Sequence, residues 1–132
     1  MKHLRLIALF SLLAVPLSAQ TPEFPEDSGN SFLRICSAVE KENRTQTESE
    51  NVMACLAYVS GFGDGVLVER SFARVNMGRK VSAPFCRPSG VEKGQIIRVV
   101  LKHIRDNPAD AHHSTASLIL SALRKAYPCQ SQ

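Results

Sequence analysis

Histidine and acidic side chains are concentrated in one short stretch, where they could bind a metal ion. In order along the chain, they are His103, Asp106, Asp110, His112 and His113. Imidazole nitrogens and carboxylate oxygens suit zinc or copper. However, no two histidines have the His-x-x-x-His spacing that places two ligands on one face of a helix. We therefore interpret these residues as exposed turn and helix-capping residues, and we predict no metal site and no cofactor.

Four cysteines could act as nucleophiles, metal ligands or disulfide partners: Cys36, Cys55, Cys86 and Cys129. An even number of cysteines in an exported chain favours disulfides. A disulfide-bonded cysteine is not a thiolate, and the sequence has no Gly-x-Ser-x-Gly motif to present a serine nucleophile. The sequence therefore predicts no catalytic residue and no enzymatic activity.

Three glycines, Gly61, Gly63 and Gly65, lie inside a segment whose apolar periodicity is helical. Each costs about 1 kcal/mol relative to alanine in a helix. Their spacing matches neither a dinucleotide-binding nor a Walker phosphate loop. Ala57, Gly61 and Gly65 recur every four residues, which predicts a smooth groove where another helix can approach closely. Asp64, beside this groove, is interpreted as a structural hydrogen-bond or ion-pair acceptor rather than an acid catalyst.

A cluster of basic residues follows these glycines, with no acidic residue between Glu69 and Glu92. It could be a solvated face or a docking surface for an acidic partner, since clustered charge speeds and orients association. The candidate partner-binding residues are Arg70, Arg74, Arg79, Lys80 and Arg87. The whole chain has a net charge of +4. This balance is too mild to indicate nucleic-acid binding.

The first residues have the pattern of a secretory signal peptide. A charged start is followed by an apolar run from Leu6 to Val15 and then by Ser18-Ala19, after which we expect cleavage. The apolar run is shorter than the ~20 residues of a membrane span. An uncleaved membrane anchor is the alternative. We predict a signal peptide over residues 1–19, a flexible leader over 20–31 and no membrane span in the mature chain.

The rest of the chain reads as four helices with no convincing strand, which predicts a small all-α, four-helix bundle-like domain over residues 32–132. We expect the first helix to be capped by Ser31 and to end before residues 41–47. The second would begin at a Thr47–Glu50 capping box, run to about Arg74 and be followed by a loop over 76–88.

Two further helices are predicted in the second half of the chain. The third would begin at a Ser89–Glu92 capping box, carry the apolar stripe Ile97, Val100, Leu101 and Ile104, and stop before Pro108. The fourth would lie between Pro108 and Tyr127, and Pro128 would end it.

The helix layout favours one of the three possible disulfide connectivities. Two cysteines on neighbouring antiparallel helices can meet only when both lie at similar distances from the turn between them. The midpoint of Cys36 and Cys55 falls in the polar first connection, and that of Cys86 and Cys129 falls at Asn107-Pro108. We therefore predict the pairs Cys36–Cys55 and Cys86–Cys129.

Three ordered blocks of sequence together resemble the Rap/Tai-type immunity proteins of type VI secretion systems. The first block contains Cys55, Tyr58, Gly61, Asp64 and Gly65; the second contains Cys86, Pro88, Gly90 and Val91; the third ends in Ala126, Tyr127, Pro128 and Cys129. The resemblance covers residues 32 to 129. Most of the matched residues are cysteines, glycines and small or apolar helix positions, so the resemblance carries over the scaffold and not the binding surface.

This resemblance implies a periplasmic protein that binds an incoming effector, such as a peptidoglycan amidase, and blocks its active site. The expected partner is therefore the effector protein, and a homodimer is a further possibility. The alternative is a general periplasmic binding or envelope-stress module without a cognate toxin.

Overall fold

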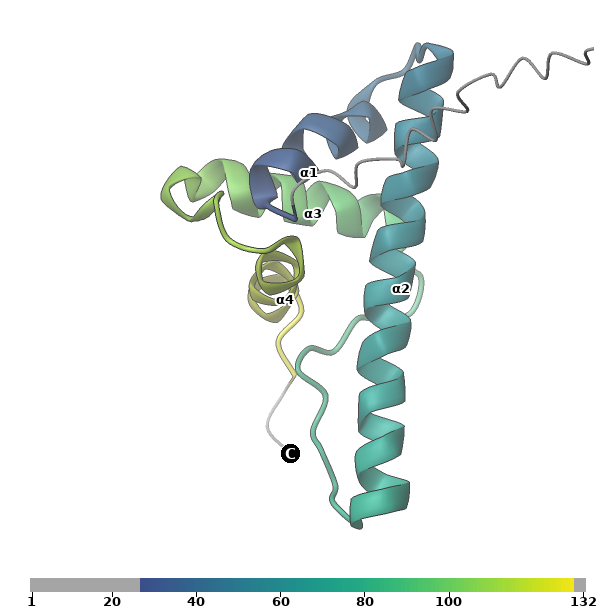
Figure 1. The fold of residues 1–132 in the computed structure, drawn as a ribbon, viewed down its shortest axis with the longest axis vertical. Coiled ribbons are helices and arrows are strands. Elements are labelled where there is room, and N and C mark those ends of the chain that lie inside the picture. Colours follow the sequence, from purple (N-terminus) through teal and green to yellow (C-terminus); the bar gives the residue numbers. More distant parts are fainter. Residues whose placement is uncertain (1–26, 130–132) are drawn as a thin grey trace, which may run out of the picture.

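The computed structural model describes residues 27–129, and within that range it is all-α with no strand, as predicted. Its elements are α1 (Gly29–Cys36), the 3₁₀ helix η1 (Ser37–Glu40), α2 (Gln46–Met77), α3 (Lys93–Asp106), the 3₁₀ helix η2 (Pro108–Asp110) and α4 (Thr115–Ala126). The long helix α2 runs the full height of the domain, and α1, α3 and α4 are grouped on one side of it (Figure 1). The predicted signal peptide lies outside the described residues.

The core is centred on α3, whose predicted apolar stripe is fully buried. Ile97, Val100, Leu101 and Ile104 are all 0% exposed, and their i, i+3, i+4, i+7 spacing places them on one face. This face packs most extensively against α4, where Ile119 is also 0% exposed. Complete burial of such side chains contributes about 1.5–3 kcal/mol each. Helices α3 and α4 therefore form the stable base on which the other elements lie.

Helix α1 begins earlier than predicted, because its N-cap is Ser28 rather than Ser31. The Ser28 hydroxyl accepts a hydrogen bond from the backbone N–H of Ser31. The next residue, Gly29, donates its backbone N–H to the carbonyl of His113 at 3.1 Å. A Cβ on Gly29 would come within 3.0 Å of the carbonyl oxygen of Ala111. This contact between two backbones requires glycine and fixes the start of the helix.

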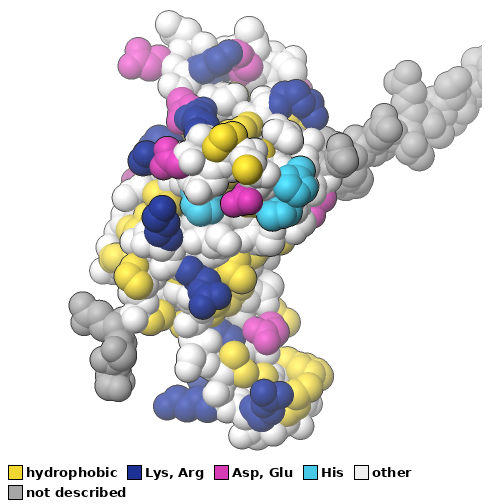
Figure 2. All heavy atoms as spheres, turned by 90° about the vertical axis from the view of Figure 1, so that its left-hand side faces the viewer, with side chains coloured by type: hydrophobic (Ala, Val, Ile, Leu, Met, Phe, Trp, Pro, Cys, Tyr) yellow, Lys and Arg dark blue, Asp and Glu magenta, His cyan; other side chains and the backbone are white. Residues whose placement is uncertain are grey.

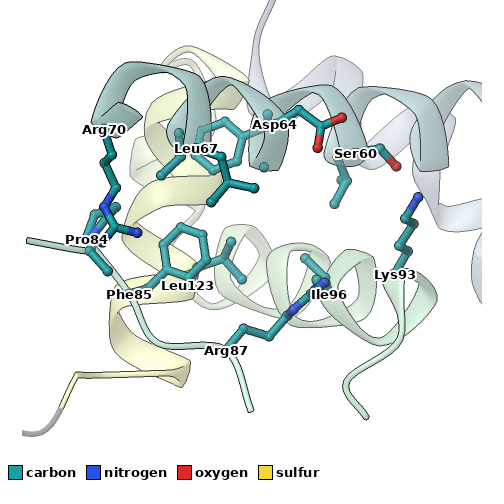
Figure 3. Close-up of a pocket in the computed structure, with 15 residues that line it drawn as sticks. Ser60, Asp64, Leu67, Arg70, Pro84, Phe85, Arg87, Lys93, Ile96 and Leu123 are labelled. Atoms are coloured by element: carbon teal, nitrogen blue, oxygen red, sulfur yellow. The ribbon is translucent and has the colours of Figure 1, made fainter. Parts of the chain in front are cut away.

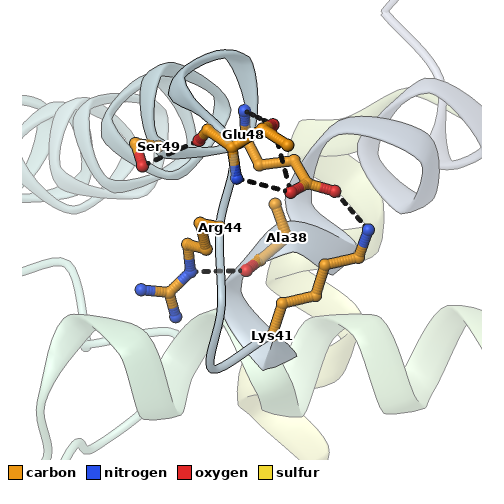
Figure 4. A network of polar contacts seen from close by, with 6 residues as sticks. Ala38, Lys41, Arg44, Glu48 and Ser49 are labelled. Carbon is orange, nitrogen blue, oxygen red and sulfur yellow. Dashed lines mark hydrogen bonds and ion pairs between the residues drawn. The ribbon is translucent and has the colours of Figure 1, made fainter.

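The capping box of α2 is Thr45–Glu48, so the predicted Thr47–Glu50 box is wrong. The Thr45 hydroxyl accepts a hydrogen bond from the Glu48 backbone N–H, and the Glu48 carboxylate accepts one from the Thr45 backbone N–H (Figure 4). Lys41 also forms an ion pair with Glu48. These contacts, led by the Lys41 hydrogen bond, lower the pKa of Glu48 to about 2. Glu48 is therefore ionised at neutral pH and can hold the start of the helix.

The connection between α1 and α2 is held by Arg44 as well as by a disulfide. Arg44 donates from Nε to the carbonyl of Ala38 at 2.8 Å and from Nη2 to that of Val39 at 3.0 Å. Both carbonyls belong to η1, whose groups would otherwise lack helical partners. The turn is therefore fixed immediately before α2 begins.

Two other helix ends differ from the prediction. Helix α2 continues past Arg74 until Gly78, which ends it in the left-handed conformation (φ 62°) that glycine adopts without strain. Helix α3 has Glu92 as its N-cap with no side-chain hydrogen bond, so the predicted Ser89–Glu92 capping box does not form. Gly90, with φ 88°, instead turns the chain into α3.

The two predicted disulfides are confirmed. Cys36–Cys55 joins α1 to α2 with a Cα–Cα distance of 5.7 Å, and Cys86–Cys129 joins residues before α3 and after α4 at 4.8 Å. In the chain-entropy model they contribute roughly 3 and 4 kcal/mol. Cys36 and Cys55 are each 2% exposed, whereas Cys86 and Cys129 lie at the surface.

Candidate interaction site

A pocket of about 310 Å³ opens between α2, the start of α3 and the chain that connects them (Figure 3). We call residues 78–92 the return segment, because this chain runs back along α2 after the helix ends (Figure 1). The floor of the pocket is apolar and includes Val59, Phe62, Phe85, Ile96 and Leu123. Such a floor can accommodate an apolar side chain of a partner.

The rim of the pocket carries more positive than negative charge. Arg70, Arg87 and Lys93 line it together with one carboxylate, Asp64. In Figure 3, Arg70 extends from α2 toward the return segment and Lys93 extends from α3 toward α2. The three ion pairs found among residues 27–129 involve none of these four side chains. The pocket therefore presents an apolar floor under a cationic rim, which suits an acidic partner surface with an apolar tip.

Helical spacing explains how α2 contributes to the pocket. Val59, Gly63, Val66 and Arg70 follow one another at intervals of four, three and four residues, which places them on one face. An ideal Cβ built on Gly63 meets no heavy atom within 4 Å, so the missing side chain leaves the space open. This role was not predicted from the sequence, although the helical spacing from Val59 to Arg70 indicates that these residues share one face.

The structure brings together only part of the basic cluster selected from the sequence. Arg70 and Arg87 both line the pocket, and Arg70 also donates from Nε to the carbonyl of Val81 at 3.3 Å. The other three basic residues are exposed outside the pocket lining: Arg74, Arg79 and Lys80. Lys93 also lines the pocket, but it was not predicted as a partner-binding residue, because it follows Glu92 and so lies outside the basic run in the sequence.

The predicted helix-packing groove of α2 is not filled by any element of the described residues, so the prediction that another helix approaches it is not tested within this chain. Cβ atoms built on Gly61 and Gly65 meet no heavy atom within 4 Å. The same face carries large apolar side chains that are mostly exposed: Met53 at 66%, Val68 at 67%, Phe72 at 54% and Val75 at 79%. Only Cys55, Val59 and Ala73 of this 32-residue helix are buried. We call the exposed apolar side the outer face of α2.

Other residues of the first and second sequence blocks, Tyr58, Pro88 and Gly90, lie outside the pocket lining and contribute to the fold. The Tyr58 hydroxyl donates to the Asp27 carboxylate at 3.2 Å, and burial, followed by the Asp27 charge, raises the pKa of Tyr58. Asp27 also accepts the backbone N–H of Thr115 at 3.2 Å, at the start of α4. Pro88 and Gly90 lie in the turn before α3.

The third block ends the last helix. Tyr127 is the C-cap of α4, and Pro128 separates it from Cys129.

The histidine-rich stretch does not form a metal site among residues 27–129. Histidine side chains lie near an acidic side chain on one face of the domain (Figure 2). The rings of His112 and His113 have centroids 4.2 Å apart, and His112 Nδ1 lies 2.9 Å from the carbonyl of Ala109. Within the described range, however, no three metal-ligating side chains are close enough to hold an ion. His103 lies on α3, within its last turn.

In a comparison with protein families, one family model matches most of the chain. The family model described as Rap1a immunity proteins matches residues 28–129. This span begins at the N-cap of α1 and ends at the second cysteine of the exposed disulfide. No curated protein and no solved structure matches the chain.

Proposed function

Because the chain belongs to the Rap1a immunity protein family, we propose that it protects the cell that makes it by binding a type VI secretion effector. The family match over the whole described domain is the observation that supports this proposal. We further propose that the effector is a cell-wall amidase and that binding covers its active site. The protein itself would act by binding and not by catalysis.

We propose that the pocket between α2 and the return segment is the contact for the effector. Its cationic rim and apolar floor match an acidic, apolar-tipped loop. The pocket walls come from α2, α3 and α4, and the return segment is disulfide-bonded at Cys86. A preformed site of this kind reduces the ordering cost of association.

We place the protein in the periplasm, with residues 1–19 removed as a signal peptide. The apolar run from Leu6 to Val15 followed by Ser18-Ala19 supports this localisation, as does the presence of two disulfides. Residues 28–31 form the N-cap and first turn of α1, so the leader predicted over residues 20–31 is too long, and we propose that it ends before Ser28.

The decisive experiment co-expresses the full chain with a candidate periplasm-targeted toxin encoded by a neighbouring gene. Wild-type protein should restore growth and form a complex. The double variant Arg70→Glu/Arg87→Glu should bind at least tenfold more weakly, since reversing rim charges repels an acidic partner. Arg124→Glu, on the exposed side of α4, is the matched control and should protect like wild type. If wild-type protein neither protects nor binds, the general envelope module becomes the better explanation.

A second copy of the chain is our proposed occupant of the outer face of α2. By length and composition α2 could cross a membrane, but the disulfide at Cys55 and the buried Val59 attach it to the domain. Exposed apolar patches of several hundred Å² mark interaction sites. In an antiparallel pair, Glu50 near the start of α2 would lie near Arg79, just beyond the end of α2, in the other copy. Phe72→Glu should abolish the dimer measured by light scattering; an unchanged mass would refute this interface.

A further inference from the structure

We propose that the exposed disulfide Cys86–Cys129 holds the wall of the pocket in place and is under redox control. A dithiol reductant would break this disulfide and release the wall. The pocket wall would then be ordered only in the oxidised protein. The structural part of this inference is independent of the effector. Its consequence for immunity rests on the proposed function.

The two disulfides differ sharply in their access to a reductant. Cys36 and Cys55 are each 2% exposed and belong to the hydrophobic core, with Val59 and Phe32 in the same cluster. Cys86 and Cys129 are both exposed. A thiolate must reach a sulfur atom along the S–S axis to exchange with it, so access controls the rate. The surface disulfide should therefore be reduced first.

This disulfide is attached to the chain segment that forms one wall of the pocket, although the cysteines themselves do not line it. Ala83, Pro84 and Phe85 line the pocket immediately before Cys86, and Arg87 lines it immediately after. The sulfur bond anchors this wall to the end of α4, 43 residues further along the chain.

Few polar contacts hold the return segment apart from this bond. Where the segment leaves α2, the Arg79 N–H donates to the carbonyl of Ala73 at 3.1 Å. Beyond that point its backbone is attached by the Cys86 N–H to the carbonyl of Tyr127 at 2.8 Å, and by the carbonyl of Val81 to Arg70 Nε at 3.3 Å. Phe85 and Val91 are only partly buried against the core. A segment with no helix and few buried contacts opens at low free energy. Once the disulfide is broken, the wall should become mobile while the α3–α4 core remains folded.

The reaction is a balanced thiol–disulfide exchange. A thiolate of the dithiol attacks Cys86 or Cys129, forming a mixed disulfide and releasing the other cysteine as a thiolate, which takes a proton. The second thiol of the reductant then displaces the attached cysteine. The products are two protein thiols and one oxidised dithiol, and two electrons pass from the reductant to the protein disulfide.

Control of the pocket by redox state would confine effector binding to an oxidising compartment. A newly made chain in the reducing cytosol would lack the Cys86–Cys129 disulfide, because cytosolic thiols are kept reduced. It would therefore bind its effector weakly there. After oxidation, the return segment would be fixed and the pocket complete. A producing cell would thus neutralise the effector where it arrives and not where it is synthesised.

The first experiment treats oxidised protein with graded dithiothreitol, traps thiols with N-ethylmaleimide and maps them by mass spectrometry. Labelling of Cys86 and Cys129 should require a dithiothreitol concentration at least tenfold lower than labelling of Cys36 and Cys55. Hydrogen exchange of the variant Cys86→Ser/Cys129→Ser should be at least tenfold faster than wild type in the return segment, while the helical circular dichroism of the folded domain stays unchanged. Simultaneous reduction of both bonds, or unchanged exchange in the return segment, would overturn the proposal.

The second experiment measures binding of the adjacent-gene effector to the wild-type protein and to Cys86→Ser/Cys129→Ser. We expect at least a tenfold loss of affinity in the variant. If both bind equally well, redox control of binding is wrong and the immunity function stands. If the oxidised wild-type protein does not bind, the immunity function is wrong, whereas the order of reduction is still decided by the first experiment.

Discussion

Replacing Gly61 or Gly65 with alanine should stabilise the isolated domain. Both positions lie inside α2, and an added Cβ has no heavy atom within 4 Å. Alanine removes the backbone-entropy penalty of glycine, which is about 1 kcal/mol in a helix interior. The double variant should therefore gain roughly 2 kcal/mol, because neither methyl group meets a neighbour that could offset the gain.

The free energy of unfolding can be measured by urea titration followed by helical circular dichroism at micromolar protein concentration. For a domain of this size, 1 kcal/mol corresponds to roughly 4 °C in melting temperature, so the double variant should melt about 8 °C higher. Gly78→Ala is the matched control. Its φ of 62° strains any residue with a Cβ, so it should lose stability although space is available.

The same two alanines also test the proposed contact between copies of α2. Added methyl groups on the outer face would prevent close approach of a second helix, so the variant should dimerise more weakly while its monomer is more stable. Loss of stability by Gly61→Ala in dilute monomer would refute the reasoning, because some group would then have to pack against this glycine.

Other substitutions test the remaining contacts. Gly29→Ala should cost about 2–3 kcal/mol in urea unfolding, since its Cβ meets a backbone carbonyl; a neutral effect would contradict that contact. Thr45→Ala should cost about 1 kcal/mol and Thr47→Ala less than about 0.5 kcal/mol; equal losses would contradict the capping-box assignment. The Arg105 hydrogen bond lowers the pKa of Glu40, so their ion pair stabilises the fold above pH 4.5 and is lost as the pH falls below it. The urea-midpoint difference between wild type and Glu40→Gln should be small and should shrink in acid; a difference that grows would show the wrong sign.

The buried face of α3 and the disulfide pairing could be predicted from the sequence. The stripe from Ile97 to Ile104 gave the buried face of α3, since apolar residues at helical spacing have few other arrangements. The disulfide pairing followed from the positions of turns alone. Neither inference required the exact first residue of any helix.

Helix ends were less predictable, because the same local motif occurs more than once. Thr45-x-x-Glu48 and Thr47-x-x-Glu50 are both valid capping boxes, and contacts made by Lys41 and Arg44 in the preceding turn distinguish them. The sequence alone does not indicate which of the two capping boxes forms, because this depends on the conformation of the preceding turn.

The candidate site was predicted only in part, for a related reason. Arg70 and Arg87 were selected because they belong to a basic run, but the pocket also needs Lys93 and Phe85. These residues meet only after the return segment folds back on α2. The absence of a side chain at Gly63 is also visible only once the opposite wall is known.

The contacts of Asp27 have a consequence for the kinetics of folding. Its carboxylate accepts the backbone N–H of Thr115, and the two residues are 88 positions apart. Gly29 similarly bonds to His113, so the first helix is seated on the turn that precedes the last helix. Pairings between distant parts of a chain form late, because a large loop must close before they contribute. During synthesis, therefore, α1 cannot reach its final position until α4 has been made, and the domain completes folding only when nearly the whole chain is available.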